Sequence, residues 1–363
     1  MKTKRDIYCD YRFWEEFFEM EDVVLHNRSM RKQWDAFYDF LSNNNLFFNI
    51  PAQRVNEDTP GGINLNEIRQ KKGGAGIKFI PNRFPIIENL SDDDDDILNS
   101  VFLTTSDTSE CEALSAKFGI MVFNTSMVFT ADHIFIDNGV SFDNANGQNW
   151  SFLYDLKTKN PSICCCNSLV VADRYLLADV SVRVLDVNMR PIFDALLPQS
   201  LDNGIIFTIC IIAQQMGSSI ESKTVRLENL VKSLRPNLRF KLNVFNSKKL
   251  HDRSILTNNI ILTSGAGFDV IGSDEFPLRF TTTSLCFPFL QSISNDDSKY
   301  LDWINNVLNT ERTCRSYQRN YWGAEDTYHH LLDYYYEEPQ IPRASFSLGA
   351  AFGDVLLKAR ASN

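Results

Sequence analysis

The sequence lacks any long apolar run. Hydrophobic residues make up 44% of its 363 positions, but no stretch approaches the roughly 18 consecutive apolar residues of a membrane helix. The charged N-terminus, MKTKRDIYCDYRFWEEFF, has neither the apolar centre nor the cleavage site of a signal peptide. We therefore expect a cytoplasmic protein with no membrane span.

Paired cysteines and an excess of positive charge are also missing. The eight cysteines include no repeated CxxC and no disulfide-like spacing, so we expect buried free thiols in a reducing compartment. The net charge is −10, whereas a protein that holds nucleic acid along an extended surface usually carries a basic balance or a basic face. This balance argues against a stable nucleic-acid scaffold. The same negative balance is compatible with an enzyme that binds a single nucleic-acid strand beside a metal site.

Strand-like and helix-like segments alternate along the chain, which is typical of an α/β fold with parallel strands. A chain of 363 residues is longer than a single hydrophobic core usually supports. Between 128 and 150 the alternation of strand-like and helix-like segments gives way to a stretch rich in Asn, Gly and Asp. We therefore predict two domains, one at 1–150 and one at 151–363 that ends in a helical tail. The expected strands include 6–10, 46–50, 77–80, 120–123, 163–172, 205–213 and 238–245, with two more flanking residues 251–268. The expected helices include one in which Phe13, Trp14 and Phe17 recur at helical spacing, and 110–118, 189–197, 222–234, 298–309, 326–336 and 346–358; Gly119 ends the helix at 110–118. Residues 52–76 are expected to form a loop.

Acidic residues follow strand-like segments in the first half. Asp10 comes after IYC, Asp107 comes after FLTTS, and an acidic run extends from Asp92 to Asp96. Open α/β sheets place their sites at the carboxyl ends of strands, so we expect these acids to converge at one sheet edge. Glu67 is a further candidate. Each acid also has a structural explanation, because Asp10 and Asp107 suit helix N-caps and the run suits a solvated turn before a helix.

This arrangement resembles the PIN-type nucleases. Those proteins place an aspartate after the first strand, more acids on following helices, and one after the fourth strand in a Thr-x-Asp context, which Asp107 matches. The resemblance implies that Asp10, Asp95 and Asp107 are the catalytic residues and hold Mg²⁺ or Mn²⁺. The ion would activate water to hydrolyse the phosphodiester bonds of RNA or single-stranded DNA.

A second motif lies in the C-terminal half, in the segment HDRSILTNNIILTSGAGFD at 251–269. His251 is followed by Arg253, four residues, Asn258, six residues and Gly265. This spacing resembles the phospholipase D pattern of His-x-Lys, four residues, Asp, six residues, and Gly-Ser. The sequence also has His251-Asp252-Arg253 and Gly267-Phe268-Asp269. In this it is similar to the non-catalytic phospholipase D-like domain of some membrane-trafficking proteins, which favours His-Asp-Arg followed by Gly-Leu-Asp or Gly-Phe-Asp.

The resemblance implies a phosphate site formed by His251, Arg253, Asn258 and Gly265. In the active family, the histidine attacks phosphorus and the lysine stabilises charge on the phosphoryl oxygens. Arg253 can still grip phosphate bidentately, but Asn258 cannot carry the charge of an aspartate, so we expect ordinary hydrolysis to be lost. Alternatively, His251, Arg253 and Asp269 form a buried polar network that fixes two adjacent strands.

Two weaker signals have structural explanations. KKGGAG at 71–76 lacks the order of a phosphate-binding loop and suits a flexible loop, although Lys71 and Lys72 could contact a nucleic-acid backbone. His329 and His330 lie on an aromatic helix at spacings that a zinc ion could use, and exposed helical polar residues explain them without a metal. The acids that would join them are Glu325, Asp326 and Asp333.

The two motifs together predict a nucleic-acid-directed effector. In this hypothesis the first domain is a metal-dependent nuclease, and the second senses a phosphate ligand or docks a partner. By analogy with the systems in which such domains occur together, we expect a role in prokaryotic anti-phage defence. We also expect the chain to act with a protein partner or with a second copy of itself. The alternative is a non-catalytic phosphate- or nucleic-acid-binding subunit of a larger complex.

Overall fold

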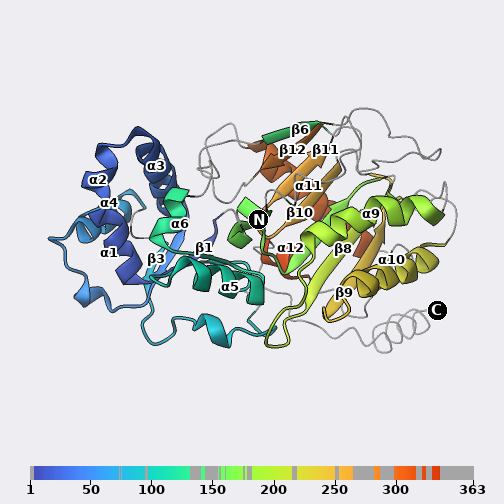
Figure 1. Cartoon of the computed structure of the whole chain (residues 1–363), viewed down its shortest axis with the longest axis horizontal. Coiled ribbons are helices and arrows are strands. Elements are labelled where there is room, and N and C mark those ends of the chain that lie inside the picture. Colours follow the sequence, from blue (N-terminus) through green and yellow to red (C-terminus); the bar gives the residue numbers. More distant parts are fainter. Residues whose placement is uncertain are drawn as a thin grey trace, which may run out of the picture.

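The computed structural model describes most of the first 130 residues and separate segments of the remainder. The described residues are 4–72, 74, 76–94, 97–130, 140–143, 154, 157–159, 161–174, 176–177, 182–214, 219–249, 253–264, 282–286, 298–315, 321–323 and 329–335. They form two sheets with helices packed around them, so the predicted α/β fold is confirmed (Figure 1). Within these segments, no helix is long and apolar enough to cross a membrane.

The first sheet has five strands in the order β3-β2-β1-β4-β5, and each neighbouring pair is parallel. The strands are β1 (Asp6–Cys9), β2 (Asn45–Phe48), β3 (Ile77–Phe79), β4 (Val101–Leu103) and β5 (Met121–Phe123). The order reverses beside β1, because the chain first adds β2 and β3 on one side and then β4 and β5 on the other. The candidate functional site lies at this reversal.

The helices around the first sheet are α1 (Tyr11–Glu19), α2 (Glu21–Leu25), α3 (Arg28–Asn43), α4 (Pro60–Lys71), α5 (Thr108–Phe118) and α6 (Thr125–Thr130), with 3-10 turns η1 (Ala52–Arg54) and η2 (Ile87–Asn89). Of these, α1 and α3 are rich in buried aromatic residues. On α1, Phe13, Trp14 and Phe17 recur at helical spacing and are fully buried. Trp14 packs edge-on against Phe48 of β2, with the ring centroids 5.2 Å apart. Burial of each such ring stabilises the fold by roughly 2–3 kcal/mol.

Helix α4 differs from the sequence-based expectation of a loop over 52–76. Thr59 caps the helix by accepting a hydrogen bond from the backbone N–H of Gly62, and Pro60 occupies the first turn, where no N–H is needed. The indole N–H of Trp14 donates to the carbonyl of Gly61 (2.8 Å). Tertiary contact with α1 therefore compensates for the low helix propensity of the two glycines.

The second sheet has eight strands in the order β13-β9-β8-β7-β10-β11-β12-β6. Strands β7, β8 and β9 are parallel, and the other pairs are antiparallel. The strands are β6 (Val140–Asp143), β7 (Ser168–Ala172), β8 (Phe207–Ala213), β9 (Phe240–Asn246), β10 (Arg253–Thr257), β11 (Ile261–Ser264), β12 (Thr282–Cys286) and β13 (Tyr321–Gly323). Strands were expected on either side of the 251–268 motif, but β10 and β11 lie within it.

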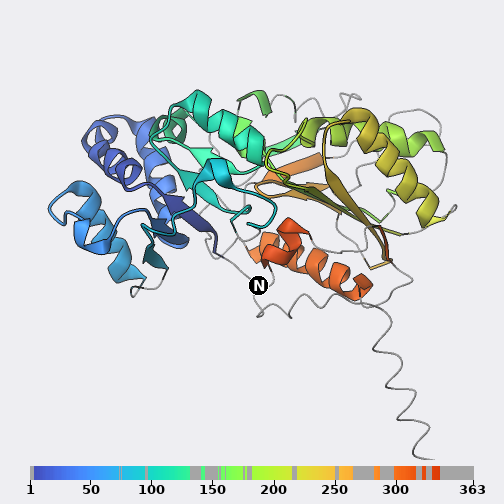
Figure 2. The same cartoon turned by 90° about the horizontal axis from the view of Figure 1, so that it is seen from below.

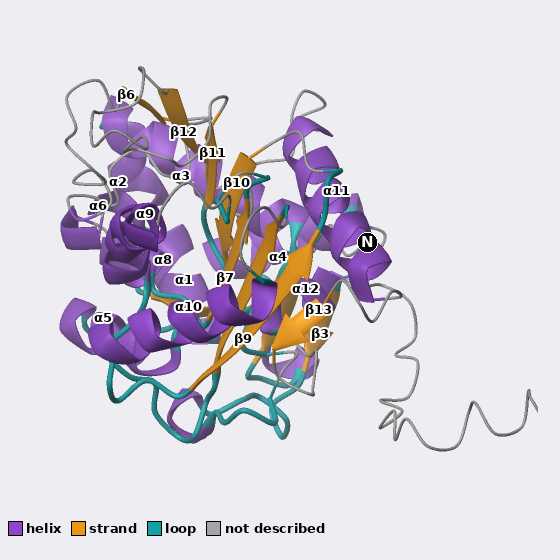
Figure 3. Ribbon diagram, turned by 90° about the vertical axis from the view of Figure 1, so that its right-hand side faces the viewer, coloured by secondary structure: helices purple, strands orange, loops and turns teal. Residues whose placement is uncertain are grey.

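Helices cover both faces of the second sheet (Figure 2, Figure 3). They are α8 (Pro161–Cys164), α9 (Val182–Leu196), α10 (Ile220–Leu234), α11 (Ser298–Arg315) and α12 (His330–Tyr335). Figure 2 shows α9 and α10 on one side and α11 and α12 on the other. Two separate clusters of buried apolar side chains correspond to these two faces. The final helix expected at 346–358 lies outside the described residues.

The two sheets share a buried core. A single cluster of buried apolar side chains includes Ile7 on β1, Leu169 on β7 and Leu262 on β11. Strand β6 precedes the boundary predicted at residue 150, yet it pairs with β12 in the second sheet. The division of the chain into domains 1–150 and 151–363 stays a prediction.

Candidate functional site

The best-formed site candidate lies where the strand order of the first sheet reverses. Ligands of open parallel sheets bind beyond the carboxyl ends of the strands at such a reversal. Asp10 follows β1 directly, and its backbone N–H donates to the carbonyl of Leu103 (2.8 Å), the last residue of β4. Asp107 comes four residues after Leu103. Both predicted residues therefore lie beyond the ends of neighbouring parallel strands.

Both aspartates also cap helices, as the structural explanation predicts. Oδ1 of the half-buried Asp10 accepts from the backbone N–H of Arg12 (2.9 Å) at the start of α1. Oδ1 of the exposed Asp107 accepts from the Ser109 hydroxyl (2.7 Å) and the backbone N–H of Glu110 (2.8 Å) at the start of α5. These bonds, that of Ser109 first, hold the pKa of Asp107 below its ordinary value. The capping bonds use Oδ1 of each aspartate, so Oδ2 takes no part in them.

Two asparagines that the sequence analysis missed organise the same edge. Asn49 follows β2, and its Oδ1 accepts from the backbone N–H of Tyr11 (2.9 Å), next to Asp10. Asn124 follows β5, and its amide donates to the carbonyl of Ser106 (2.9 Å), next to Asp107. The available signal was their position as the first residue after a buried strand-like segment.

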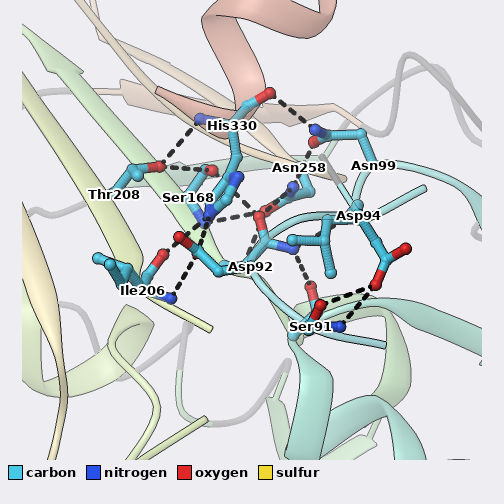
Figure 4. Close-up of polar contacts among 12 residues, drawn as sticks. Ser91, Asp92, Asp94, Asn99, Ser168, Ile206, Thr208, Asn258 and His330 are labelled. Carbon is cyan, nitrogen blue, oxygen red and sulfur yellow. Dashed lines mark hydrogen bonds and ion pairs between the residues drawn. The ribbon is translucent and has the colours of Figure 1, made fainter. Parts of the chain in front are cut away.

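The acidic run does not deliver a third carboxylate to this edge among its described members. Asp92 accepts from the backbone N–H of Ile206 (2.9 Å) and lies 3.3 Å from Nε2 of His330 (Figure 4). Oδ2 of Asp94 accepts from the backbone N–H (2.8 Å) and hydroxyl (3.0 Å) of Ser91. Asp95 lies outside the described residues. The predicted metal site therefore has two described members, Asp10 and Asp107.

The donor chemistry at the edge suits a hard divalent cation. Mg²⁺ in proteins is commonly held by one or two carboxylates together with water and substrate phosphates, so Asp10 and Asp107 are donors of the type that such an ion takes. Across the part of the chain that the structure describes, no group of three or more His, Cys, Asp or Glu side chains could hold a metal. Glu67, the further candidate, lies on α4 close enough to Tyr38 to raise the pKa of its hydroxyl, although burial raises that pKa more.

The C-terminal motif places Arg253 beside a buried carboxylate. Strand β10 pairs antiparallel with β7, with Ser254 opposite Ala172, so Arg253 begins β10 where β7 ends. Nε of Arg253 lies 3.6 Å from Oδ1 of Asp173, whose side chain is 1% exposed. His251 and Gly265 lie outside the described residues. Of the predicted phosphate-binding residues, Arg253 and Asn258 are thus the two that can be placed.

Asn258 is buried in a polar junction between the two sheets (Figure 4). Its Oδ1 accepts from the backbone N–H groups of Asn167 (3.0 Å) and Ser168 (3.1 Å). Its amide donates to Oδ1 of Asn167 (2.9 Å) and to Oδ1 of Asn99. Arg5 donates to its carbonyl oxygen (2.7 Å). In this conformation the Asn258 side chain bonds within the protein at both of its polar atoms, which a phosphate ligand would have to displace.

His329 and His330 are buried at the same junction, so the expectation of exposed helical residues is wrong. Nε2 of His329 contacts the carbonyl of Leu169 (3.3 Å), and its Nδ1 accepts from the backbone N–H of Leu332 (3.3 Å). Burial lowers the pKa of His329 to about 3, which keeps the ring neutral. The side chain of Asp333 and the residues Glu325 and Asp326 lie outside what the structure describes.

The two lysines proposed for nucleic-acid contact both have partners within the fold. The ammonium of Lys72 donates to the carbonyls of Leu41 (3.2 Å) and Asn44 at the end of α3. Burial, followed by the charge of Lys4, lowers the pKa of Lys72 to about 8. The ammonium of Lys71 lies 5.3 Å from the centre of the Tyr38 ring. Lys72 thus acts as a cap for α3.

No protein-family model matches the chain, and no curated protein matches it. One solved structure with similarity to the chain is that of TrmBL2, an archaeal chromatin protein. The match has 8% sequence identity and a TM-score of 0.24, and it covers 48% of this chain and 53% of that one. The match thus spans about half of the archaeal protein, and similarity at this level carries no argument about fold or function.

Proposed function

We propose that the protein is a metal-dependent phosphodiesterase that cleaves RNA or single-stranded DNA. The observation that carries this proposal is the placement of Asp10 and Asp107 beyond neighbouring parallel strands where the strand order reverses. The resemblance to PIN-type nucleases supports the same assignment, with Asp95 as the third acid.

The aspartates would hold Mg²⁺ or Mn²⁺, which supplies an activated water and neutralises charge on the phosphate. Their capping bonds fix the orientation of each carboxylate, so the second oxygen is positioned before any ligand arrives. The lowered pKa of Asp107 extends the range in which its carboxylate is charged to more acidic conditions. The N-termini of α1 and α5, which begin at these residues, favour a negatively charged phosphate nearby.

In this proposal the second half of the chain senses a phosphate-bearing ligand or docks a partner. His251, Arg253 and Gly265 would contact a phosphate-bearing ligand there. The setting that we propose is an anti-phage effector that acts with a protein partner or a second copy of itself.

Cleavage of labelled RNA and single-stranded DNA tests the activity, in Mg²⁺ or Mn²⁺ and in EDTA. Asn is as good a helix N-cap as Asp, so Asp107→Asn and Asp10→Asn keep the caps while removing the charge. We expect each to lower the cleavage rate by about 100-fold. The matched control is Asp93→Asn, an exposed member of the acidic run, which should cleave like the wild type. Cleavage that survives EDTA, or that Asp107→Asn leaves intact, would contradict the proposal.

The second candidate function is a non-catalytic phosphate- or nucleic-acid-binding subunit. It is favoured by the altered C-terminal motif, in which Arg253 and Asn258 stand where the phospholipase D pattern has lysine and aspartate, and by the net charge of −10. Adding His251→Ala to the same assay separates the two candidates. Cleavage lost in Asp107→Asn and kept in His251→Ala supports the enzyme. A folded wild type that binds but does not cut supports the binding subunit.

A further inference from the structure

One row of side chains crosses all five strands of the first sheet and becomes accessible at one end. The strand registers place the members of the row opposite one another in the order Lys78, Phe47, Tyr8, Phe102 and Val122. Phe102 and Val122 are buried, Tyr8 and Phe47 are half-buried, and Lys78 is exposed. The row therefore reaches solvent toward β3, at the edge of the sheet.

The topology puts no described α-helix over this half of the face, which the connection from β3 to β4 crosses with Phe84 beside Tyr8. Side chains alternate along a strand, so Tyr8 and Phe47 lie on the face opposite to Phe48, which α1 covers. Crossovers between parallel strands are right-handed, so the connections from β1 to β2 and from β2 to β3 share the α1 face. The connection from β4 to β5 runs in the reverse direction across the sheet, and α5 therefore covers the other face beside β4 and β5.

The accessible end combines aromatic rings with positive charge. The Tyr8 ring stacks on Phe47 (5.0 Å between centroids) and on Phe102 (5.2 Å), and Phe84 meets it edge-on (5.8 Å). The ammonium of Lys78 lies 5.3 Å from the centre of the Phe47 ring. Arg83, next to Phe84, is exposed. Asp6, two residues before Tyr8 on β1, accepts a hydrogen bond from the amide of Asn45 (2.8 Å).

Phe47 and Phe84 are not explained by the main core. Both are half-buried, and neither belongs to the apolar cluster that the described residues form around the first sheet. Half-exposed rings beside cationic side chains are the combination with which proteins hold single-stranded nucleic acid, since every base has a face that can pack against a ring.

We infer that Tyr8, Phe47, Phe84, Lys78 and Arg83, hereafter the aromatic patch, bind the bases and phosphates of single-stranded nucleic acid. This inference rests on the proposed function and names where its substrate lies. Tyr8 lies on β1 and Asp10 directly follows that strand, and a separation of two residues corresponds to about 7 Å along extended backbone. A nucleotide held on the patch therefore places its neighbouring phosphate beside the candidate catalytic edge.

Fluorescence anisotropy with labelled 15-mers of dT and U tests the inference in EDTA, so that binding is measured without cleavage. Phe47→Ala and Phe84→Ala should each weaken binding by about 10-fold, because each removes one base contact. Lys78→Ala should weaken binding and also reduce the slope of log K against log salt by about 0.7, the value for one phosphate contact on a single strand. Phe47→Ala should leave that slope unchanged.

Matched controls lie on the second half of the chain. Tyr154→Ala removes an aromatic side chain that is 40% exposed, and Lys232→Ala removes an exposed lysine of α10. Both should bind like the wild type, and thermal melting confirms that every variant is folded. Wild-type affinity in folded Phe47→Ala and Phe84→Ala, or no binding by the wild type at low salt, would overturn the inference. Patch-dependent binding without cleavage would leave it standing while the nuclease proposal fails.

Discussion

At the scale of single residues, the hydrogen bonds in the buried junction between the sheets have a fixed donor and a fixed acceptor. Asn99 donates its amide to the carbonyl of His330 (2.7 Å), and Asn167 donates its amide to the carbonyls of Leu98 (2.8 Å) and Gly119 (3.2 Å). Backbone carbonyls accept these bonds, so the two amide groups cannot rotate without losing them. Both asparagines consequently present Oδ1 to Asn258, which must supply the hydrogens.

This fixed assignment of donors and acceptors predicts how much stability the protein loses when the aspartate of the phospholipase D pattern replaces Asn258. Asn258→Asp removes two donors and places a carboxylate against two amide oxygens in a buried site. We expect the free energy of unfolding to fall by about 2–4 kcal/mol, measured by chemical denaturation. The matched control is Asn237→Asp in an exposed turn, which should change stability by less than about 0.5 kcal/mol. Equal stability of the two variants would show that the junction can reverse its hydrogen bonds.

At the scale of elements, helices with strong local signals could be predicted and others could not. The apolar spacing of α1 and the Gly119 that ends α5 identify those helices from sequence, and the structure confirms both. Helix α4 could not be predicted from propensity, because its Gly61 and Gly62 are poor helix formers and contacts with α1 stabilise it.

The same distinction holds for the candidate site. Asp10 and Asp107 could be placed at one edge because each follows a strand-like segment and parallel strands end together. The role of Asn258 could not be predicted, because its partners Arg5 and Asn99 lie 253 and 159 residues away in sequence. Nor could the sequence distinguish Asp92 from the rest of its acidic run, since its partner Ile206 comes from the second half of the chain.

A glycine at the end of α5 tests how closely the two halves pack. Gly119 has a left-handed φ of 63°, and an added Cβ would lie 2.5 Å from the carbonyl oxygen of Cys166. Gly74 has a similar φ of 76°, but an added Cβ there meets nothing within 4 Å. Gly74→Ala should therefore cost only the backbone strain of about 1–2 kcal/mol.

Gly119→Ala adds a collision with backbone to the same strain. We expect it to destabilise the protein by at least about 2 kcal/mol more than Gly74→Ala does, measured as the difference in the free energy of unfolding. If the two variants are equally stable, the segment at Cys166 moves away from α5 at little cost, and the close contact between the halves is not a fixed feature.

At the scale of the whole molecule, the shared core and the polar junction bear on how the chain unfolds. Apolar side chains of both sheets form one buried cluster. Arg5, immediately before β1, donates to the carbonyl of Asn258 (2.7 Å) and to Oδ1 of Asn259 (2.8 Å), immediately after β10. Separating the sheets would expose this apolar cluster to water and break these hydrogen bonds, which together costs several kcal/mol.

Unfolding of one sheet should therefore carry the other with it. Val101 on β4 and Val170 on β7 are both fully buried, and truncation of either to alanine should lower stability by about 2 kcal/mol. In native-state hydrogen exchange, we expect each variant to speed the slowest amides of both sheets by a similar factor of about 30. An effect of Val101→Ala confined to β1–β5 would instead mean that the first sheet unfolds alone, as independent domains divided at residue 150 would. Since the buried contacts cross that boundary, we expect the cooperative result.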